Sequence, residues 1–246
     1  MLFIENYSFA CYNKRNYCCK VGKKVAKIIN NLEIIQSNIE QAKNRANKDQ
    51  QVHIVAVTKQ VDVARTEEAI AAGLLHLGEN RPEGIQSKRQ AIQTNAKWHY
   101  IGSLQTRKVK QIIDAIDYLH SLDRLSLAEE IEKRASKTIK CFVQVNVSGE
   151  ESKHGLTGEQ ALQFMQQLQA FSKIEVIGLM TMAPFTEDES TVRTVFQQLK
   201  LLQQEVQKLQ LSNVPCTELS MGMSNDYEIA VEEGATFVRI GTALVG

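Results

Sequence analysis

Lys59 is the residue of this sequence best placed for covalent chemistry. It ends the run 53–59, His-Ile-Val-Ala-Val-Thr-Lys, which is typical of a buried β-strand with an amine at its tip. In α/β proteins the chemistry lies at the carboxyl ends of such strands. We expect burial there to favour the neutral amine, the form that attacks a carbonyl to give a Schiff base. The alternative is an ordinary surface lysine that caps the strand.

Two later segments have the composition of an anion-binding site. In 220–226, Ser-Met-Gly-Met-Ser-Asn-Asp, a strand signal runs into a helix signal, and Gly222 allows a ligand to approach the backbone closely. In 239–242, Arg-Ile-Gly-Thr, Gly241 exposes its backbone N–H and Thr242 adds a hydroxyl. Barrels of the (β/α)8 class often bind phosphate after their seventh and eighth strands, which is where these segments fall. The alternative for the first segment is an ordinary helix cap.

Arg239 is expected to point into the interior of the fold, where an arginine needs an acceptor. One candidate acceptor is a carboxylate such as Glu218, and the other is the ring nitrogen of a bound cofactor. A Schiff-base lysine, an anion site and an interior arginine together indicate pyridoxal phosphate as the cofactor.

Short apolar runs alternate with amphipathic segments along the chain and predict eight strands. The expected strands are 52–58, 75–78, 98–101, 118–121, 141–147, 176–182, 216–220 and 237–240. The expected helices are 25–46, 64–72, 81–93, 106–115, 126–135, 158–170, 189–209 and 225–233. This alternation predicts an α/β fold, a single (β/α)8 TIM-type barrel with an extra N-terminal helix and no second β-domain. A doubly wound open sheet is the competing architecture.

The 246-residue chain contains three prolines and no linker rich in Gly, Ser or Pro, so we expect one domain, a cofactor-binding barrel at 25–246. Residues 1–24 hold three of the five cysteines and several basic residues, without the apolar core of a signal peptide. We expect this segment to be a disordered extension.

Charge and cysteine content exclude several classes of protein. The net charge of +1 gives no field that would recruit nucleic acid or an anionic membrane, and no apolar stretch is long enough to span a bilayer. The five cysteines form neither a disulfide framework nor a zinc-binding pattern. We therefore expect no metal site and a reducing, cytoplasmic location.

Eight short motifs resemble, in their order, those of the pyridoxal phosphate homeostasis protein family, relatives of the barrel domain of alanine racemase. The resemblance covers about 52–245. The motifs are Ala-Val-Thr-Lys at 56–59, Gly-Glu-Asn at 78–80, Trp-His-Tyr-Ile-Gly at 98–102, His-Ser-Leu-Asp at 120–123, Gln-Val-Asn-Val-Ser at 144–148, Gly-Leu-Met-Thr-Met at 178–182, Ser-Met-Gly-Met-Ser at 220–224 and Val-Arg-Ile-Gly-Thr at 238–242.

The resemblance implies specific roles for residues of this sequence. It implies that Lys59 is the aldimine lysine, that Arg239 faces the pyridine nitrogen and that Asn80 lines the same pocket. The residues that it implies to hold the phosphate are Ser220, Gly222, Ser224, Gly241 and Thr242.

The same resemblance leads us to expect a carrier of the cofactor and no catalytic residues. An arginine stays charged and can only donate, so Arg239 is expected to leave the ring nitrogen unprotonated and the ring a weak electron sink. Alanine racemases share this arginine but add a tyrosine base from a further β-domain of a partner subunit, whereas this sequence ends at its eighth strand. We expect a monomer that stores, delivers and buffers pyridoxal phosphate, with apo-enzymes as recipients.

Two alternatives stay open. One is a pyridoxal phosphate-dependent amino-acid racemase or lyase in which Tyr100 or His99 is the second base. The other is a Schiff-base aldolase on the same barrel without pyridoxal phosphate. Visible absorbance of the purified protein separates the second from the first.

Overall fold

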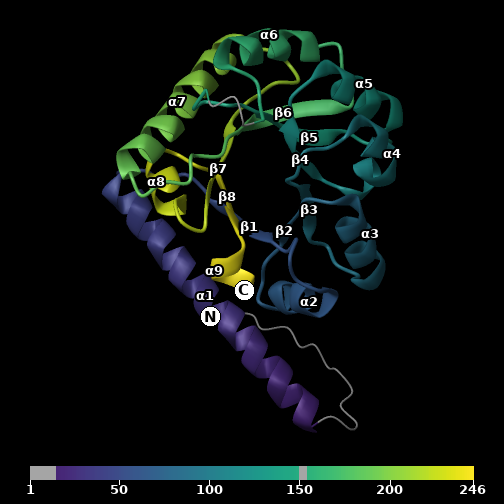
Figure 1. The fold of residues 1–246 in the computed structure, drawn as a ribbon, viewed down its shortest axis with the longest axis vertical. Coiled ribbons are helices and arrows are strands. Elements are labelled where there is room, and N and C mark those ends of the chain that lie inside the picture. The colour runs from purple at the N-terminus through teal and green to yellow at the C-terminus, as the bar shows by residue number, and fades with distance from the viewer. Residues whose placement is uncertain (1–14, 150–153) are drawn as a thin grey trace, which may run out of the picture.

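Eight parallel strands form a closed barrel (Figure 1) in the computed structural model, which describes residues 15–149 and 154–246. Each strand pairs with its neighbour in sequence, and β1 pairs with β8 to close the ring. The strands are β1 (His53–Val57), β2 (His76–Glu79), β3 (Lys97–Tyr100), β4 (Tyr118–Leu122), β5 (Ile139–Gln144), β6 (Ile174–Met180), β7 (Glu218–Met223) and β8 (Phe237–Ile240). The closed ring confirms the expected (β/α)8 barrel and excludes the doubly wound open sheet.

The barrel is filled by side chains. Successive residues of a strand point to opposite faces, so each strand contributes both to the interior and to the layer under the helices. The interior holds an apolar cluster of Val55, Phe142, Ile177, Met180 and Phe237. In barrels packed in this way, ligands bind at the ends of the strands.

Helices follow the strands and cover the outside of the barrel (Figure 1). They are α2 (Val63–Ala71), α3 (Pro82–Ala91), α4 (Val109–Ile112), α5 (Leu125–Arg134), α6 (Gly158–Leu168), α7 (Glu189–Lys208), α8 (Tyr227–Glu232) and α9 (Thr242–Val245). Two details differ from the sequence-based expectation. The expected helix 106–115 is divided, since 3-10 turns at Thr106–Lys108 and Ile113–Ala115 flank α4. The short α9 after the last strand was not expected.

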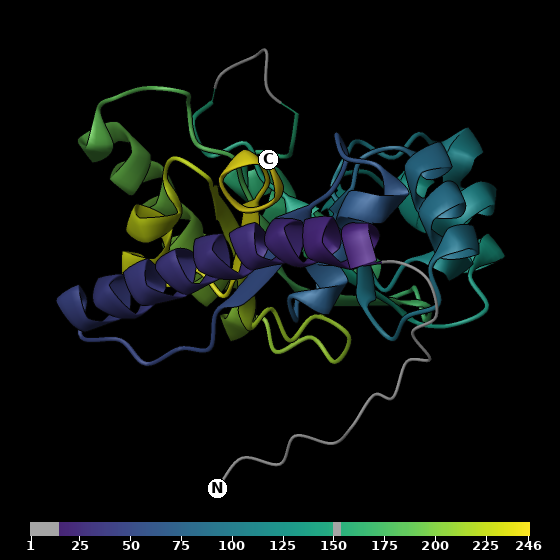
Figure 2. The ribbon, with the colours of Figure 1, turned by 90° about the horizontal axis from the view of Figure 1, so that it is seen from below.

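The long helix α1 (Arg15–Arg45) crosses the outside of the barrel and packs against α8, α9 and α2 (Figures 1 and 2). It buries Ile28, Ile35 and Ile39 at helical spacing. The helix begins earlier than the expected position 25, because 15–24 contains no proline that would stop it. It therefore includes part of the segment expected as an extension, and the rest of that segment, 1–14, lies outside the described residues.

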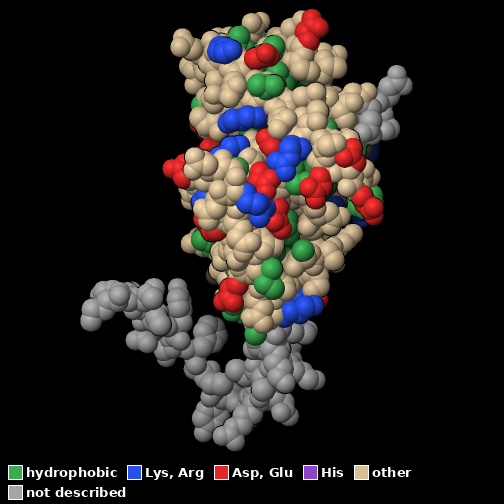
Figure 3. Space-filling model, turned by 90° about the vertical axis from the view of Figure 1, so that its left-hand side faces the viewer, with side chains coloured by type: hydrophobic (Ala, Val, Ile, Leu, Met, Phe, Trp, Pro, Cys, Tyr) green, Lys and Arg blue, Asp and Glu red, His purple; other side chains and the backbone are tan. Residues whose placement is uncertain are grey.

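An ionic network joins α1 to α7 and α8. Arg45 pairs with Glu228 at 3.0 Å and Glu232 at 2.6 Å, while Arg193 pairs with Glu232 at 2.7 Å and Glu233 at 2.6 Å. Figure 3 shows this side of the molecule, where acidic and basic side chains are interspersed. A face with mixed charges fits the low net charge. Among the described helices, none combines the length and apolarity needed to cross a membrane.

Candidate functional site

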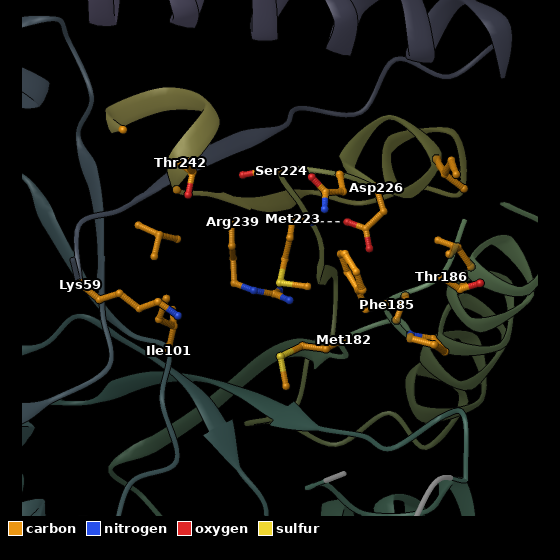
Figure 4. A pocket seen from close by; sticks show the side chains of 18 of the residues that line it. Lys59, Ile101, Met182, Phe185, Thr186, Met223, Ser224, Asp226, Arg239 and Thr242 are labelled. Carbon is orange, nitrogen blue, oxygen red and sulfur yellow. Dashed lines mark hydrogen bonds between the residues drawn. The ribbon is translucent and has the colours of Figure 1, made fainter. Parts of the chain in front are cut away.

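A cavity of about 960 Å³ opens at the carboxyl ends of the barrel strands (Figure 4). Its wall is formed mainly by the loops that follow β1, β6, β7 and β8. The structure brings five of the eight predicted site residues to this wall, namely Lys59, Ser224, Arg239, Gly241 and Thr242. This is the end of the barrel at which the sequence placed the chemistry.

Lys59 reaches into the cavity from its position two residues beyond β1, and Figure 4 shows it beside Ile101. Its side chain is exposed, so the burial of this amine expected from the sequence is wrong for the open cavity. The reason is local: β1 ends at Val57, and the loop carries Lys59 past the packed layer to the mouth. A ligand that fills the cavity covers the amine.

A buried ion pair supports the backbone that carries Lys59. Lys88 Nζ lies 2.5 Å from Glu79 Oε1 and donates to the Thr58 carbonyl oxygen at 2.6 Å. The Thr58 hydroxyl donates to the same Glu79 oxygen at 2.7 Å. Lys88, Glu79 and Thr58 are all buried. Sequence reasoning missed Lys88, although a signal existed: it lies three residues after the buried Ile85, on the apolar face of α3, where a lysine needs a partner.

Arg239 is 5% exposed and is held in one orientation. Its Nη1 donates to Ser220 Oγ at 2.6 Å, and its Nη2 donates to the Thr181 carbonyl oxygen at 2.9 Å. Burial lowers the pKa of Arg239 to about 10, against the opposing effect of the Asp226 carboxylate, so the guanidinium is charged at neutral pH. The carboxylate alternative, Glu218, is not its partner, because Glu218 opens β7 and accepts from the Thr217 hydroxyl instead.

Ser224 and Thr242 bring two hydroxyl groups to the cavity from different loops (Figure 4). Ser224 lies in the turn between β7 and α8, which is closed by a hydrogen bond from the Met223 N–H to the Asp226 carboxylate. Thr242 is the first residue of α9, and Gly241 is its N-cap. This part of the wall therefore offers hydroxyl and backbone donors close to the charged Arg239, a set that suits an anion.

Three predicted site residues are not on the cavity wall. Ser220 is fully buried and bonded to Arg239. Gly222 has a φ of +91°, and a Cβ at this position would lie 2.6 Å from the Ala230 Cβ, so glycine lets the turn pack on α8. Asn80 is half-buried, and its backbone packs against Gly102.

The two side chains considered as a second base lie away from the cavity wall. Tyr100 is 2% exposed, and burial raises its pKa to about 12. His99 is fully buried inside the barrel. Neither is placed to exchange a proton with a ligand beside Lys59.

The remaining wall combines apolar side chains with the carboxylates of Glu187, Glu189 and Asp226. Figure 4 shows Met182, Phe185 and Met223 on the side away from Lys59, with Asp226 above them. Burial raises the pKa of Asp226. Within the described residues there is no group of three His, Cys, Asp or Glu side chains that could hold a metal ion.

Comparison with known proteins matches residues 30–246 to the family of alanine racemase N-terminal domains. A protein of Aquifex aeolicus named pyridoxal phosphate homeostasis protein is 39% identical over 220 residues, covering 87% of this chain and 96% of that protein. The structure of PipY from Synechococcus elongatus with PLP bound is 31% identical, covers 89% of this chain and all of that chain, and superposes with a TM-score of 0.79. An alanine racemase of Clostridium difficile, 14% identical with a TM-score of 0.69 and matched over 56% of its chain, shares the fold.

Proposed function

This chain belongs to the pyridoxal phosphate homeostasis protein family, and from that premise we propose that it binds pyridoxal phosphate and thereby stores, delivers and buffers the cofactor. The observation that carries the proposal is the sharing of one cavity by Lys59 and the anion-binding wall of Ser224, Gly241 and Thr242. An amine and a phosphate cradle facing one space are what a phosphorylated aldehyde requires. The match to PipY, whose structure contains PLP, supports the same ligand.

The donor set of the cavity fits this cofactor. When bound, pyridoxal phosphate supplies an aldehyde that condenses with an amine and a ring that withdraws electrons. In our proposal Lys59 holds the cofactor as a Schiff base, Arg239 donates to the ring nitrogen, and Ser224, Gly241 and Thr242 hold the phosphate.

The three predicted residues that lie off the wall take supporting roles in this proposal. Ser220 orients Arg239 from below, since its hydroxyl accepts from the guanidinium. Gly222 allows the turn that presents Ser224. Asn80 packs against Gly102 and supports the loops that follow β2 and β3.

We propose that the protein is a carrier and has no catalytic residue. Arg239 is charged at neutral pH and can only donate, so it keeps the ring nitrogen unprotonated and weakens the electron sink. Relatives that match most of the chain, such as the Aquifex aeolicus protein, are named pyridoxal phosphate homeostasis proteins, which supports a non-catalytic role. We further propose that it acts as a monomer in the cytoplasm, as one barrel domain at 25–246, and that apo-enzymes receive the cofactor.

The test of this function has two arms. Titration of the purified protein with pyridoxal phosphate is expected to produce the visible absorbance band of an imine, and the loaded protein is expected to restore activity to an apo-enzyme that uses the cofactor. Racemase, transaminase and decarboxylase assays form the second arm. Turnover near one per second, which is within the usual enzyme range, would replace the carrier with the racemase or lyase alternative.

A further inference from the structure

Three consecutive strands each place one histidine inside the barrel, and the three rings are hydrogen-bonded in series. His76 Nδ1 lies 2.8 Å from His99 Nε2, and His99 Nδ1 lies 2.8 Å from His120 Nε2. His120 Nδ1 then lies 2.9 Å from Ser220 Oγ, the atom that accepts from Arg239. We call His76, His99 and His120 the histidine file. It runs from the first residue of β2, at the amino-terminal end of the barrel, to the guanidinium under the cavity.

The surroundings of the file hold its rings in place and keep them neutral. His99 is stacked on Tyr118 with ring centroids 4.2 Å apart, and His120 lies against Phe142 at 4.4 Å. Both histidines are fully buried, and burial, together with the charge of Arg239 in the case of His120, lowers their pKa values well below 6.5. A neutral imidazole has one donor and one acceptor nitrogen. The hydrogen bonds of the file can therefore all be donated towards Ser220 or all be donated towards His76.

Arg239 selects one of these directions. Because a guanidinium only donates, Ser220 Oγ is the acceptor of that bond. The Ser220 hydroxyl can donate one hydrogen bond, and its other side-chain partner in the described part of the chain is His120 Nδ1. His120 Nδ1 must therefore be an acceptor and its Nε2 a donor. The same step repeats at His99 and then at His76. If every bond instead ran towards Ser220, both His120 Nδ1 and Arg239 would donate to Ser220 Oγ, and neither could accept the hydrogen of the Ser220 hydroxyl.

We propose that the histidine file carries its proton on Nε2 of every ring and acts as a set of positioning residues for Arg239, through Ser220, from the opposite end of the barrel. In this arrangement every hydrogen between His76 Nδ1 and Arg239 has an acceptor. The guanidinium is then fixed by Ser220 and Thr181, with its other N–H groups available to a ligand. The assignment of the tautomers depends only on hydrogen bonds within the protein. The effect on cofactor binding rests on the proposed function.

The tautomers can be measured without any cofactor. Nitrogen-15 NMR of the wild-type protein labelled at histidine distinguishes Nε2–H, Nδ1–H and charged rings. We expect Nε2–H signals for His76, His99 and His120 between about pH 6.5 and 8. An Nδ1–H or charged ring at His76, His99 or His120 in that range would overturn the proposal, whatever the protein binds.

Variants test the positioning role. His120→Phe removes the acceptor for the Ser220 hydrogen and should weaken pyridoxal phosphate binding about tenfold, the effect of one lost buried hydrogen bond. His120→Asn places an amide oxygen near the Nδ1 position and should restore most of the affinity. The matched control is His53→Phe, because His53 contacts the ring of His76 inside the barrel but is not part of the file.

The outcomes separate the two claims. The positioning role is supported if the affinity for pyridoxal phosphate falls with His120→Phe, recovers with His120→Asn and does not change with His53→Phe. Equal effects of His120→Phe and His53→Phe, or no effect of either, contradict it. If the wild-type protein does not bind pyridoxal phosphate, the proposed function fails, and the NMR result alone decides the file. If His120→Phe does not fold, the proposed function is unaffected and the NMR result alone decides the file.

Discussion

Lys88 donates a hydrogen bond across 2.6 Å to the main-chain carbonyl of Thr58, the residue immediately before Lys59. The lysine that we assign to the cofactor thus stands on a backbone fixed by a second, buried lysine. Glu79 accepts from both Lys88 and Thr58 and balances the buried charge. A buried pair of this kind is costly to break, because either partner alone is an uncompensated charge.

Lys88→Met should therefore destabilise the protein by about 3–5 kcal/mol in urea unfolding, because it leaves Glu79 charged and unpaired. The double variant Lys88→Met with Glu79→Gln should recover most of this loss, since the glutamine is neutral and still accepts from Thr58. Lys108→Met is the control: its pair with Glu83, at 3.6 Å, lies at the surface, and its loss should change the stability far less. Similar losses of stability in the Lys88 and Lys108 single variants would contradict the claim that the buried Lys88–Glu79 pair stabilises the fold.

Lys59→Ala should separate covalent from non-covalent binding. The imine absorbance should disappear, while the phosphate wall retains part of the affinity. We expect a loss of about 1.4–2.8 kcal/mol, which is ten- to hundredfold, in equilibrium binding of pyridoxal phosphate. Binding that disappears altogether would mean that the wall of Ser224, Gly241 and Thr242 contributes little.

The phosphate wall can be tested with a ligand that lacks phosphate. Thr242→Val should weaken the binding of pyridoxal phosphate about tenfold, because a charged ligand loses one hydrogen bond, but should leave the binding of pyridoxal unchanged. Thr186→Val makes the same substitution on the rim of the same cavity and should affect neither ligand. Equal weakening of both ligands by Thr242→Val would place the phosphate elsewhere.

The histidine file should make stability depend on pH. Burial, helped by the charges of His53 and Lys97 and opposed by Asp117, lowers the pKa of His76 from 6.5 to about 4. Between these values the unfolded chain binds more protons at His76 than the folded chain, so the free energy of unfolding rises as the pH rises through this window. His99 and His120 act in the same direction. Because His76 is only half-buried, solvent screening reduces its effect, and we expect it to contribute about 1–3 kcal/mol at neutral pH, lost progressively as the pH falls from 6.5 towards 4.

Urea unfolding at a series of pH values measures this effect. His76→Phe removes the titrating group and should give a flatter curve than the wild type between pH 4 and 6.5. His154→Gln replaces an exposed histidine outside the file and is the control for the loss of a histidine. Parallel curves for wild type and His76→Phe would show that folding does not lower the pKa of His76.

Most of the barrel could be predicted from the sequence, because apolar runs bounded by turns mark strands clearly. All eight expected strands are present, and 237–240 coincides with β8. The start of α1 could not be predicted, because 15–24 contains no proline and helical pattern alone sets no boundary. The four residues of α9 are too few for a periodic pattern to be recognised.

The site could be predicted in part. Lys59, Ser224 and Thr242 each lie within two residues of the end of a strand, and strand ends are visible in the sequence. The exposure of Lys59 and the partners of Arg239 depend on how the loops and the interior side chains pack, which no local pattern reports. The histidine file had a signal, one histidine in each of three consecutive strands, but its bonds depend on strand register and tilt.

The most direct test of the account is mass spectrometry of the protein after loading with pyridoxal phosphate, reduction with borohydride and proteolysis. We predict one modified peptide, the one that contains Lys59, with the reduced cofactor on that lysine. The exposed Lys97 at the opposite end of the barrel is the internal control and should remain unmodified. A cofactor found on another lysine, or no covalent adduct, would contradict the claim that Lys59 and the phosphate wall form one pyridoxal phosphate site.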